Sequence, residues 1–335
     1  MLKIGVIGYG YWGPNLVRNF FSNTSCEVVA VADLKPARLA SLKKQYPSIS
    51  VTANPPSIIK DYSIEAVVIA TPAVSHFSLA KKALMQRKHV LVEKPMTLTL
   101  SQAKELISLA KKQKRVLMVD HTYLYTDAVQ KIKKLIQTNE IGKLRYFDST
   151  RTNLGIFQQD INVLWDLAAH DVSILSYLID EKPQTIQASG VSHTKNRIVN
   201  IAFITIKYPS GLVAHFNCSW SSPVKIRRIL IGGTKKMIVY DDVEPTEKIK
   251  VYDSGYAFKK NKDTATWMVD YRSGDIHIPK IELQEALIWV VKDFIDSIAR
   301  GKKPIADSDL GLEVVKILTL AQKSMKSGER PVRYR

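Results

Sequence analysis

Acidic residues are scarce in this sequence. Its 335 residues include 49 lysines and arginines but only 31 aspartates and glutamates, which gives a formal net charge of +18, although the charged fraction of 24% is ordinary. Such a charge is compatible with nucleic acid, an anionic membrane surface or a phosphorylated small molecule as partner. The lysines of segments 111–115 and 131–134 are spaced like solvated helix faces, and no aromatic-interleaved basic stripe accompanies them. We therefore expect no nucleic-acid partner.

Cysteine, glycine, proline and long apolar runs are also few. Cys26 and Cys218 cannot form a disulfide framework, and no Cys/His cluster has metal-ligand spacing, so we expect no metal site. No apolar run approaches the roughly 20 residues that span a bilayer, and the N-terminal segment lacks the pattern of a signal peptide. With 45% hydrophobic residues, 15 glycines and 14 prolines, low-complexity chains are excluded. We expect a folded, cytoplasmic protein that does not associate with membranes.

Short β-rich runs alternate with helix-period runs over the first 120 residues. Strands separated by helices indicate βαβ units, in which parallel strands form a sheet with helices on both faces. We therefore predict a doubly wound parallel sheet in residues 1–120. The predicted strands are 3–8, 27–32, 66–70, 89–92 and 116–119, and the predicted helices are 14–21, 36–46, 75–87 and 101–112.

The pattern changes after residue 120. A helix over 127–137 precedes long alternating runs without intervening helices, which are typical of antiparallel strands. The predicted fold class is α/β, with a second α/β domain over 121–335 built on an open, mainly antiparallel sheet. Residues 253–280 are polar and weakly patterned and are predicted to form a loop. The other predicted elements are strands at 143–152, 185–191, 199–208, 212–220, 226–231 and 236–240, and helices at 162–179, 283–299 and 309–326.

A glycine-rich turn separates the first predicted strand from the first predicted helix. The residues that fit its GxGxxG pattern are Gly8, Tyr9, Gly10, Tyr11, Trp12 and Gly13. In a Rossmann domain the first glycine allows the turn, the second admits a pyrophosphate, and the third lets helix and strand pack closely. The alternative is a glycine-rich turn without a ligand.

Asp33 follows the second predicted strand, twenty residues after Gly13. A carboxylate there would accept hydrogen bonds from both adenine-ribose hydroxyls and repel a 2′-phosphate, so NAD is favoured over NADP. Lys35 and Arg38 lie nearby and moderate that preference. The alternative role for Asp33 is an N-cap of the helix that begins at Pro36.

Two later predicted strands end in residues that face the same crevice. Thr71 and Pro72 follow the strand 66–70, and Glu93 and Lys94 follow the strand 89–92, where ligands of doubly wound sheets bind. We assign these four residues to the cofactor site. His76 starts the next predicted helix and is either a cofactor contact or a packing residue.

The glycine-rich turn, Asp33, Thr71-Pro72 and above all Glu93-Lys94-Pro95 resemble the Gfo/Idh/MocA oxidoreductases, which include glucose-fructose oxidoreductase and inositol dehydrogenases. The resemblance extends over essentially the whole chain and is strongest over residues 1–120. It returns at residues 165–171, WDLAAHD. It implies that Lys94 is the family's catalytic lysine and that Asp166 and His170 are its Asp-x-x-x-His pair.

The spacing of Asp166 and His170 agrees with that role. Residues four apart on a helix share a face, so the carboxylate can orient the imidazole. Oxidation of a sugar hydroxyl needs a proton acceptor, and Lys94 can donate a hydrogen bond to the developing alkoxide. Whether Lys94 or His170 is the formal base stays open, and a packing role is the alternative for the histidine. Asp171 is expected to be a cap or an exposed charge.

The substrate-binding residues are predicted from the segments 121–125 and 150–162. Many family members carry Asn and Arg where this chain has HTYLY, and the resemblance instead implies the subgroup that acts on nucleotide-linked sugars, at C3. Tyr123, Arg151 and Asn153 are the candidates, with Arg151 pairing with a substrate phosphate or carboxylate. The alternative for each is a polar surface residue.

We therefore expect an NAD-dependent oxidoreductase that transfers a hydride between nicotinamide and a ring hydroxyl or ketone of a nucleotide-linked sugar, such as a UDP-N-acetylhexosamine or its uronic acid. The alternatives are a dehydrogenase of a free sugar or cyclitol and a non-catalytic NAD-binding regulator. The resemblance also implies a homodimer or homotetramer formed through the C-terminal sheet.

Overall fold

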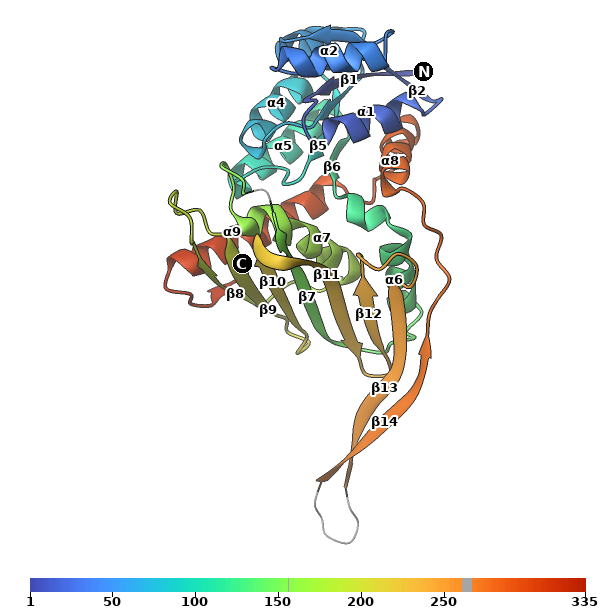
Figure 1. Cartoon of the computed structure of the whole chain (residues 1–335), viewed down its shortest axis with the longest axis vertical. Coiled ribbons are helices and arrows are strands. Elements are labelled where there is room, and N and C mark those ends of the chain that lie inside the picture. The colour runs from blue at the N-terminus through green and yellow to red at the C-terminus, as the bar shows by residue number, and fades with distance from the viewer. Residues whose placement is uncertain (156, 261–266) are drawn as a thin grey trace. The chain divides into compact units, whose positions relative to one another are not determined.

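The computed structural model describes residues 1–155, 157–260 and 267–335, which form two compact units (Figure 1). The first unit comprises Met1–Thr126 and Gln284–Thr319, and the second comprises Asp127–Leu283 and Leu320–Arg335. The predicted boundary at residue 120 places residues 284–319 in the C-terminal domain, whereas in the structure they pack with the first unit. Sequence periodicity shows that a helix exists but not which sheet or helix it packs against.

The first unit is built on a six-stranded parallel sheet in the order β3-β2-β1-β4-β5-β6. The order reverses between β1 and β4, which is the topological switch point where doubly wound sheets bind ligands. The strands are β1 (Leu2–Ile7), β2 (Cys26–Ala32), β3 (Ser50–Thr52), β4 (Ala66–Ile69), β5 (His89–Glu93) and β6 (Leu117–Asp120).

Helices connect these strands, as the alternating pattern predicts. Three short elements, β3, α3 and η1, are not predicted from the sequence, because three to six residues carry too little periodicity to distinguish. The helices are α1 (Gly13–Phe21), α2 (Pro36–Gln45), α3 (Pro55–Lys60), α4 (Ala73–Met85), α5 (Leu100–Gln113), the 3₁₀ turn η1 (Thr122–Tyr125), α8 (Ala286–Arg300) and the first part of α9 (Ser308–Lys326).

Helix α8 is held in the first unit by apolar and polar contacts. The ring of Phe294 packs edge-on against Phe20 of α1, with ring centroids 6.3 Å apart, and both rings are fully buried. The hydroxyl of Tyr125 donates to Asp293 Oδ2 of α8 at 2.8 Å. These contacts explain why a segment so distant in sequence belongs to the Rossmann unit.

The second unit is built on a nine-stranded sheet in the order β14-β13-β12-β11-β7-β10-β9-β8-β15. All described neighbours are antiparallel except β10 and β7, so the sheet is mainly antiparallel, as predicted. The strands are β7 (Leu144–Leu154), β8 (Thr185–Val191), β9 (Ile201–Lys207), β10 (Val213–Ser219), β11 (Ser221–Gly233), β12 (Met237–Asp241), β13 (Ile249–Lys260), β14 (Trp267–His277) and β15 (Val332–Arg333). Its helices are α6 (Asp127–Gln137), the π turn η2 (Leu164–Ala168), α7 (Ala169–Leu178) and the end of α9.

The prediction of a loop over residues 253–280 is wrong. Most of this segment forms β13 and β14, which extend past the ends of the other strands of their sheet (Figure 1). Every residue of β14 is exposed, so neither face is buried and the apolar/polar alternation that marks a half-buried strand is absent. Residues 261–266 of the predicted loop lie outside the described residues.

Within the described residues, no helix is long and apolar enough to cross a membrane, and no cluster of His, Cys, Asp and Glu has the arrangement of a metal site. Cys26 and Cys218 are both buried free thiols.

Candidate active site

The carboxyl ends of four parallel strands bring the predicted cofactor residues to one edge of the first sheet. Gly8 follows β1, Thr71 lies just beyond β4, and Lys94 follows β5. His121 follows β6 at the same edge. Because all these strands run in one direction, their ends gather polar groups that the sequence separates by more than a hundred residues.

The glycine-rich turn requires glycine for two separate reasons. Gly8 has a φ of +102°, and a Cβ atom there would lie 2.3 Å from the carbonyl oxygen of Ala70. A Cβ on Gly13 would lie 2.3 Å from the carbonyl oxygen of Gly8, so the start of α1 packs directly on the turn. A Cβ on Gly10 would have its nearest neighbour, the Nη1 atom of Arg38, at 3.6 Å. This combination of two tight glycines and one open glycine fits a turn that admits a diphosphate.

Asp33 lies against this turn. Its Oδ2 atom accepts a hydrogen bond from the backbone N–H of Tyr9 at 2.7 Å, and its Oδ1 accepts one from Lys35 N–H at 2.8 Å. The second bond fixes the chain just before α2, but Lys35 is the N-cap of that helix and no side chain caps it, so the N-cap alternative for Asp33 is wrong. Burial by itself raises the pKa of Asp33, but the hydrogen bonds from Lys35 and Tyr9, with the charge of Arg38, lower it overall. The carboxylate therefore stays ionised beside the turn.

Arg38 forms an ion pair with this carboxylate. Its Nη1 atom lies 3.2 Å from Asp33 Oδ2, and its side chain is 40% exposed while that of Asp33 is 6% exposed. A negative charge at this position disfavours the 2′-phosphate of NADP, as predicted from the sequence. The neighbouring guanidinium offsets part of that repulsion.

His76 connects two of the loops at this edge. Its ring is 1% exposed; Nδ1 lies 2.8 Å from the carbonyl oxygen of Pro95, and Nε2 lies 2.8 Å from that of Thr71. The hydroxyl of Thr71 is also bonded to that of Ser75, at 2.6 Å. The imidazole thus joins the Thr71 and Pro95 loops, as a packing residue would, and a cofactor contact of His76 stays a prediction.

Glu93 and Asp120 form an acidic pair behind Lys94. They are register partners in β5 and β6. Asp120 accepts hydrogen bonds from Trp12 Nε1 at 3.0 Å and from Thr122 Oγ1 at 2.6 Å, which ties the glycine-rich turn to the end of β6. Burial, and after it the charge of Asp120 and a hydrogen bond to it, raises the pKa of Glu93 well above its ordinary value. Glu93 therefore tends to keep its proton.

Lys94 and His121 come directly after Glu93 and Asp120, one residue past the ends of β5 and β6. The side chain of Lys94 is half-buried and that of His121 is 1% exposed. Burial, and secondarily the charge of Lys94, lowers the pKa of His121 to about 3, so its imidazole is neutral. His121 is not among the site residues predicted from the sequence. The signal was available, because parallel pairing of β5 and β6 makes Lys94 and His121 neighbours.

In the second unit the predicted catalytic helix begins with a π turn. Asn162 Oδ1 accepts the backbone N–H groups of Leu164 and Trp165, which caps the turn. Asp166 lies in the π turn, and its Oδ2 accepts a hydrogen bond from Trp220 Nε1 at 3.0 Å. His170 is half-buried in the first turn of α7. A π turn within a helix often marks a functional site, which agrees with the predicted role of this segment.

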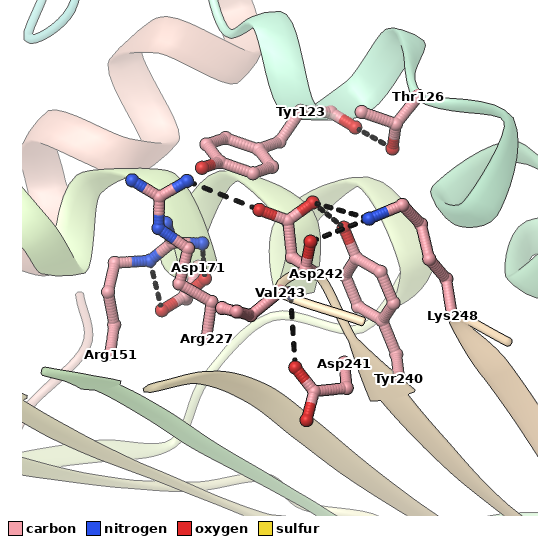
Figure 2. Close-up of polar contacts among 10 residues, drawn as sticks. All are labelled: Tyr123, Thr126, Arg151, Asp171, Arg227, Tyr240, Asp241, Asp242, Val243 and Lys248. Carbon is pink, nitrogen blue, oxygen red and sulfur yellow. Dashed lines mark hydrogen bonds and ion pairs between the residues drawn. The ribbon is translucent and has the colours of Figure 1, made fainter. Parts of the chain in front are cut away.

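Arg151 and Asp171 form a buried ion pair (Figure 2). Arg151 Nε and Nη2 donate to the two carboxylate oxygens of Asp171 at 2.9 and 2.6 Å, and Ser149 Oγ donates to Oδ2 at 2.8 Å. The exposed fractions of the two charged residues are 3% and 1%. The prediction that Asp171 is a cap or an exposed charge is therefore wrong, because its side chain points at the sheet rather than at solvent.

The remaining predicted substrate residues belong to different units. Tyr123 is half-buried in η1 of the first unit, and its carbonyl oxygen accepts the hydroxyl of Thr126 at 2.8 Å. Asn153 is half-buried near the end of β7 in the second unit. Arg151 donates two hydrogen bonds to Asp171, so a substrate anion would have to compete with the Asp171 carboxylate for the predicted pairing with Arg151.

Family models match both parts of the chain. Residues 2–121 match the model described as "Oxidoreductase family, NAD-binding Rossmann fold" of the Gfo/Idh/MocA group, and residues 129–239 match the model of the Gfo/Idh/MocA C-terminal domain. The chain belongs to the Gfo/Idh/MocA oxidoreductase family. This confirms the resemblance that rested on the glycine-rich turn and the Glu93-Lys94-Pro95 segment, and with it an NAD-binding enzyme.

Several relatives are similar to the chain. An uncharacterized oxidoreductase, YdgJ, of Escherichia coli is 36% identical over 148 residues, which is 44% of this chain and 42% of that protein. UDP-N-acetylglucosamine 3-dehydrogenase of Acidithiobacillus ferrooxidans is 24% identical over 94% of both chains. Myo-inositol 2-dehydrogenase of Thermotoga maritima is 21% identical over 97% of this chain and 96% of its own length.

Solved structures show the same fold. The structure of the Acidithiobacillus ferrooxidans UDP-N-acetylglucosamine 3-dehydrogenase GnnA superposes with a TM-score of 0.80 at 22% identity, over 98% of this chain and 99% of that one. The two-unit architecture is therefore that of known members of the family.

Proposed function

We propose that this protein is an NAD-dependent dehydrogenase or ketoreductase that acts on a ring hydroxyl or ketone, at C3, of a nucleotide-linked sugar. The observation that carries the proposal is the position of Lys94, one residue past β5, at the same sheet edge as the glycine-rich turn and Asp33. The likeness to UDP-N-acetylglucosamine 3-dehydrogenase over 94% of both chains supports the substrate class.

The cofactor would be held by residues of the first unit. The glycine-rich turn and the start of α1 would receive the diphosphate, and the carboxylate of Asp33 would accept the adenine-ribose hydroxyls. When bound, the nicotinamide accepts or supplies the hydride. Thr71 and Pro72 would border its pocket, with His76 holding their loop in place.

The proton chemistry is assigned to Lys94, His170 and Asp166. The ammonium of Lys94 would donate a hydrogen bond to the sugar oxygen, and His170 would take or return the hydroxyl proton. Asp166 would orient that imidazole, and Trp220 fixes the carboxylate by its indole N–H. The proposal covers both assignments of the formal base, Lys94 or His170. Tyr123 and Asn153 would contact the sugar.

The alternative substrate is a free sugar or cyclitol. Similarity to myo-inositol 2-dehydrogenase over 97% of this chain favours it, at somewhat lower identity. The two candidates differ in charge: a nucleotide-linked sugar carries a diphosphate, whereas a cyclitol is neutral.

The test is a turnover assay. The purified protein is mixed with NAD and, separately, with UDP-N-acetylglucosamine, its uronic acid, dTDP-glucose, free N-acetylglucosamine and myo-inositol, and NADH absorbance is followed. We expect reduction of NAD only with the nucleotide-linked sugars, and its loss in Lys94→Ala. Turnover of myo-inositol alone would establish the alternative, and full turnover by His170→Asn would refute the assigned proton chemistry.

A further inference from the structure

Two arginines lie directly opposite each other on the face of the second sheet that carries α7. Arg227 of β11 is the register partner of Arg151 of β7, so both side chains rise from the same face (Figure 2). Like charges directly opposite each other in a sheet are destabilising unless counter-charges accompany them. Each of these arginines has one, and the two counter-charges differ.

The counter-charge of Arg151 is built into the core. Asp171 binds it through two hydrogen bonds, and both side chains are almost completely buried. A ligand that took Arg151 would have to leave the Asp171 carboxylate buried without its partner. Arg151 is therefore a poor receptor for a substrate anion.

The counter-charge of Arg227 is weaker and shared. Arg227 Nη1 lies 3.3 Å from Asp242 Oδ2, and the two side chains are 35% and 17% exposed. Lys248 Nζ lies 4.0 Å from the other carboxylate oxygen of Asp242 and donates to the Asp242 carbonyl oxygen at 2.6 Å. Tyr240 donates its hydroxyl to Asp242 Oδ1 at 3.1 Å (Figure 2). One carboxylate thus faces two cations.

The cations of this face differ in how far they reach solvent. The side chain of Arg151 is 4% exposed, whereas those of Arg227 and Lys248 are 35% and 20% exposed. Arg227 and Lys248 therefore offer more of their charge to a ligand than Arg151 does. The guanidinium of Arg227 and the ammonium of Lys248 lie on either side of the Asp242 carboxylate (Figure 2). Phosphoryl oxygens suit such a pair of cations, because they accept two parallel hydrogen bonds from an arginine and interact with the compact charge of a lysine.

We propose that Arg227 and Lys248 bind the diphosphate of the nucleotide-linked substrate, and that Asp242 holds the two cations in position until the substrate arrives. The proposal rests on the proposed function for the identity of the ligand. It transfers the anion-binding role from Arg151 to its cross-strand neighbour, and Arg151 instead fixes the sheet against α7 through Asp171.

The chain offers a matched control. Arg228 is the next residue of β11, so its side chain points to the opposite face, and it also pairs with an aspartate, Asp241, through Nε at 3.1 Å and Nη2 at 2.9 Å. Arg227→Gln and Arg228→Gln therefore remove the same charge, from the same strand, on different faces.

The experiment measures binding of UDP to the full chain in the presence of NAD, by titration calorimetry, for the wild type and the variants. Losing a charge-assisted hydrogen-bond donor typically weakens binding by about 10- to 100-fold, which is the increase in Kd that we expect for Arg227→Gln. The Kd for UDP should increase less in Lys248→Gln, and Arg227→Lys should recover part of the affinity lost in Arg227→Gln. In Arg228→Gln the Kd should change by less than about twofold, because that side chain lies on the opposite face of the sheet. Unchanged NAD affinity and an unchanged melting temperature would show that each variant is folded.

The outcomes separate this inference from the proposed function. If the wild type binds UDP and Arg227→Gln weakens this binding while Arg228→Gln does not, the anion site stands even if no nucleotide-linked sugar is turned over. Equal effects of Arg227→Gln and Arg228→Gln, or no binding of UDP by the wild type, would overturn the site. Titration with glucuronate tests the other source of anionic oxygens: an effect of Arg227→Gln on glucuronate but not on UDP would overturn the diphosphate assignment.

Discussion

The buried Arg151–Asp171 pair predicts that removing one charge costs far more than removing both. In Arg151→Met the Asp171 carboxylate, 1% exposed, loses both guanidinium hydrogen bonds and keeps only that of Ser149. Breaking a buried pair in this way typically costs about 3–5 kcal/mol in the free energy of unfolding. The second unit should therefore unfold well below the wild-type temperature, by roughly 2–4 °C for each kcal/mol.

The double variant Arg151→Met/Asp171→Leu should recover most of this loss. Replacing a buried ion pair by apolar side chains of similar volume is often neutral or stabilising by about 1–4 kcal/mol, because neither charge then has to leave water. The surface pair Arg228–Asp241 provides the comparison: its arginine is 55% exposed, and Arg228→Gln should cost less than about 1 kcal/mol.

The assay is urea and thermal unfolding followed by tryptophan fluorescence. Trp165 and Trp220 are buried in the second unit, whereas Trp12 and Trp289 lie in the first. The signal is therefore fitted with two transitions wherever the two units do not unfold together. The reasoning is refuted if Arg151→Met loses no more stability than Arg228→Gln. It is also refuted if the double variant is as unstable as the single one, since the unpaired carboxylate would then not be the cause.

Three further predictions concern the candidate site. Asp33→Ser, with Arg38 retained, should lower kcat/KM for NAD, because the contact with the ribose hydroxyls is lost, and raise it for NADP, because the repulsion of the 2′-phosphate is removed. The ratio of kcat/KM for NADP to that for NAD should rise by about 10-fold or more in steady-state kinetics, and an unchanged ratio would contradict this. Glu93 has a raised pKa, so its protonated form stabilises the fold at low pH, and this contribution is lost as the pH rises through that pKa. The melting temperature of Glu93→Gln should therefore increase relative to that of the wild type with increasing pH, and an equal pH dependence of the two melting temperatures would count against this. His170→Asn should lower kcat by about 10²- to 10⁴-fold with little change in NAD affinity, as measured by turnover and by NAD titration, and a purely structural role would instead lower the melting temperature.

Much of the fold follows from local patterning. The alternating strands and helices of residues 1–120 and the long alternating runs after 140 predict the two sheets, because burial on one or both faces leaves a period in the sequence. The antiparallel pair β13–β14 could not be predicted in the same way, since β14 is exposed on both faces. The packing of α8 on α1 was equally hidden, because an amphipathic helix shows that it has a buried face but not what covers that face.

The candidate site divides along similar lines. The glycine-rich turn and Asp33 are recognisable because backbone geometry restricts which residues can occupy them, and the structure brings them into contact through the Tyr9 N–H group. Side-chain pairing is different in kind. Nothing in the local sequence indicates that Trp12 binds Asp120 or that Arg151 is neutralised by Asp171, since each pair joins residues of separate elements.

The sequence by itself therefore determines the family, the two sheets and the residues with chemistry to offer, because strand and helix periods and glycine requirements are local properties of the chain. Only the tertiary structure decides which charges are committed to each other. Arg151 and Arg227 read alike in the sequence, yet one is buried against Asp171 and the other is half-exposed beside a shared Asp242. The physical reason is that the availability of a charge depends on its burial and its partners, and both are set by strand register and helix packing rather than by residue type.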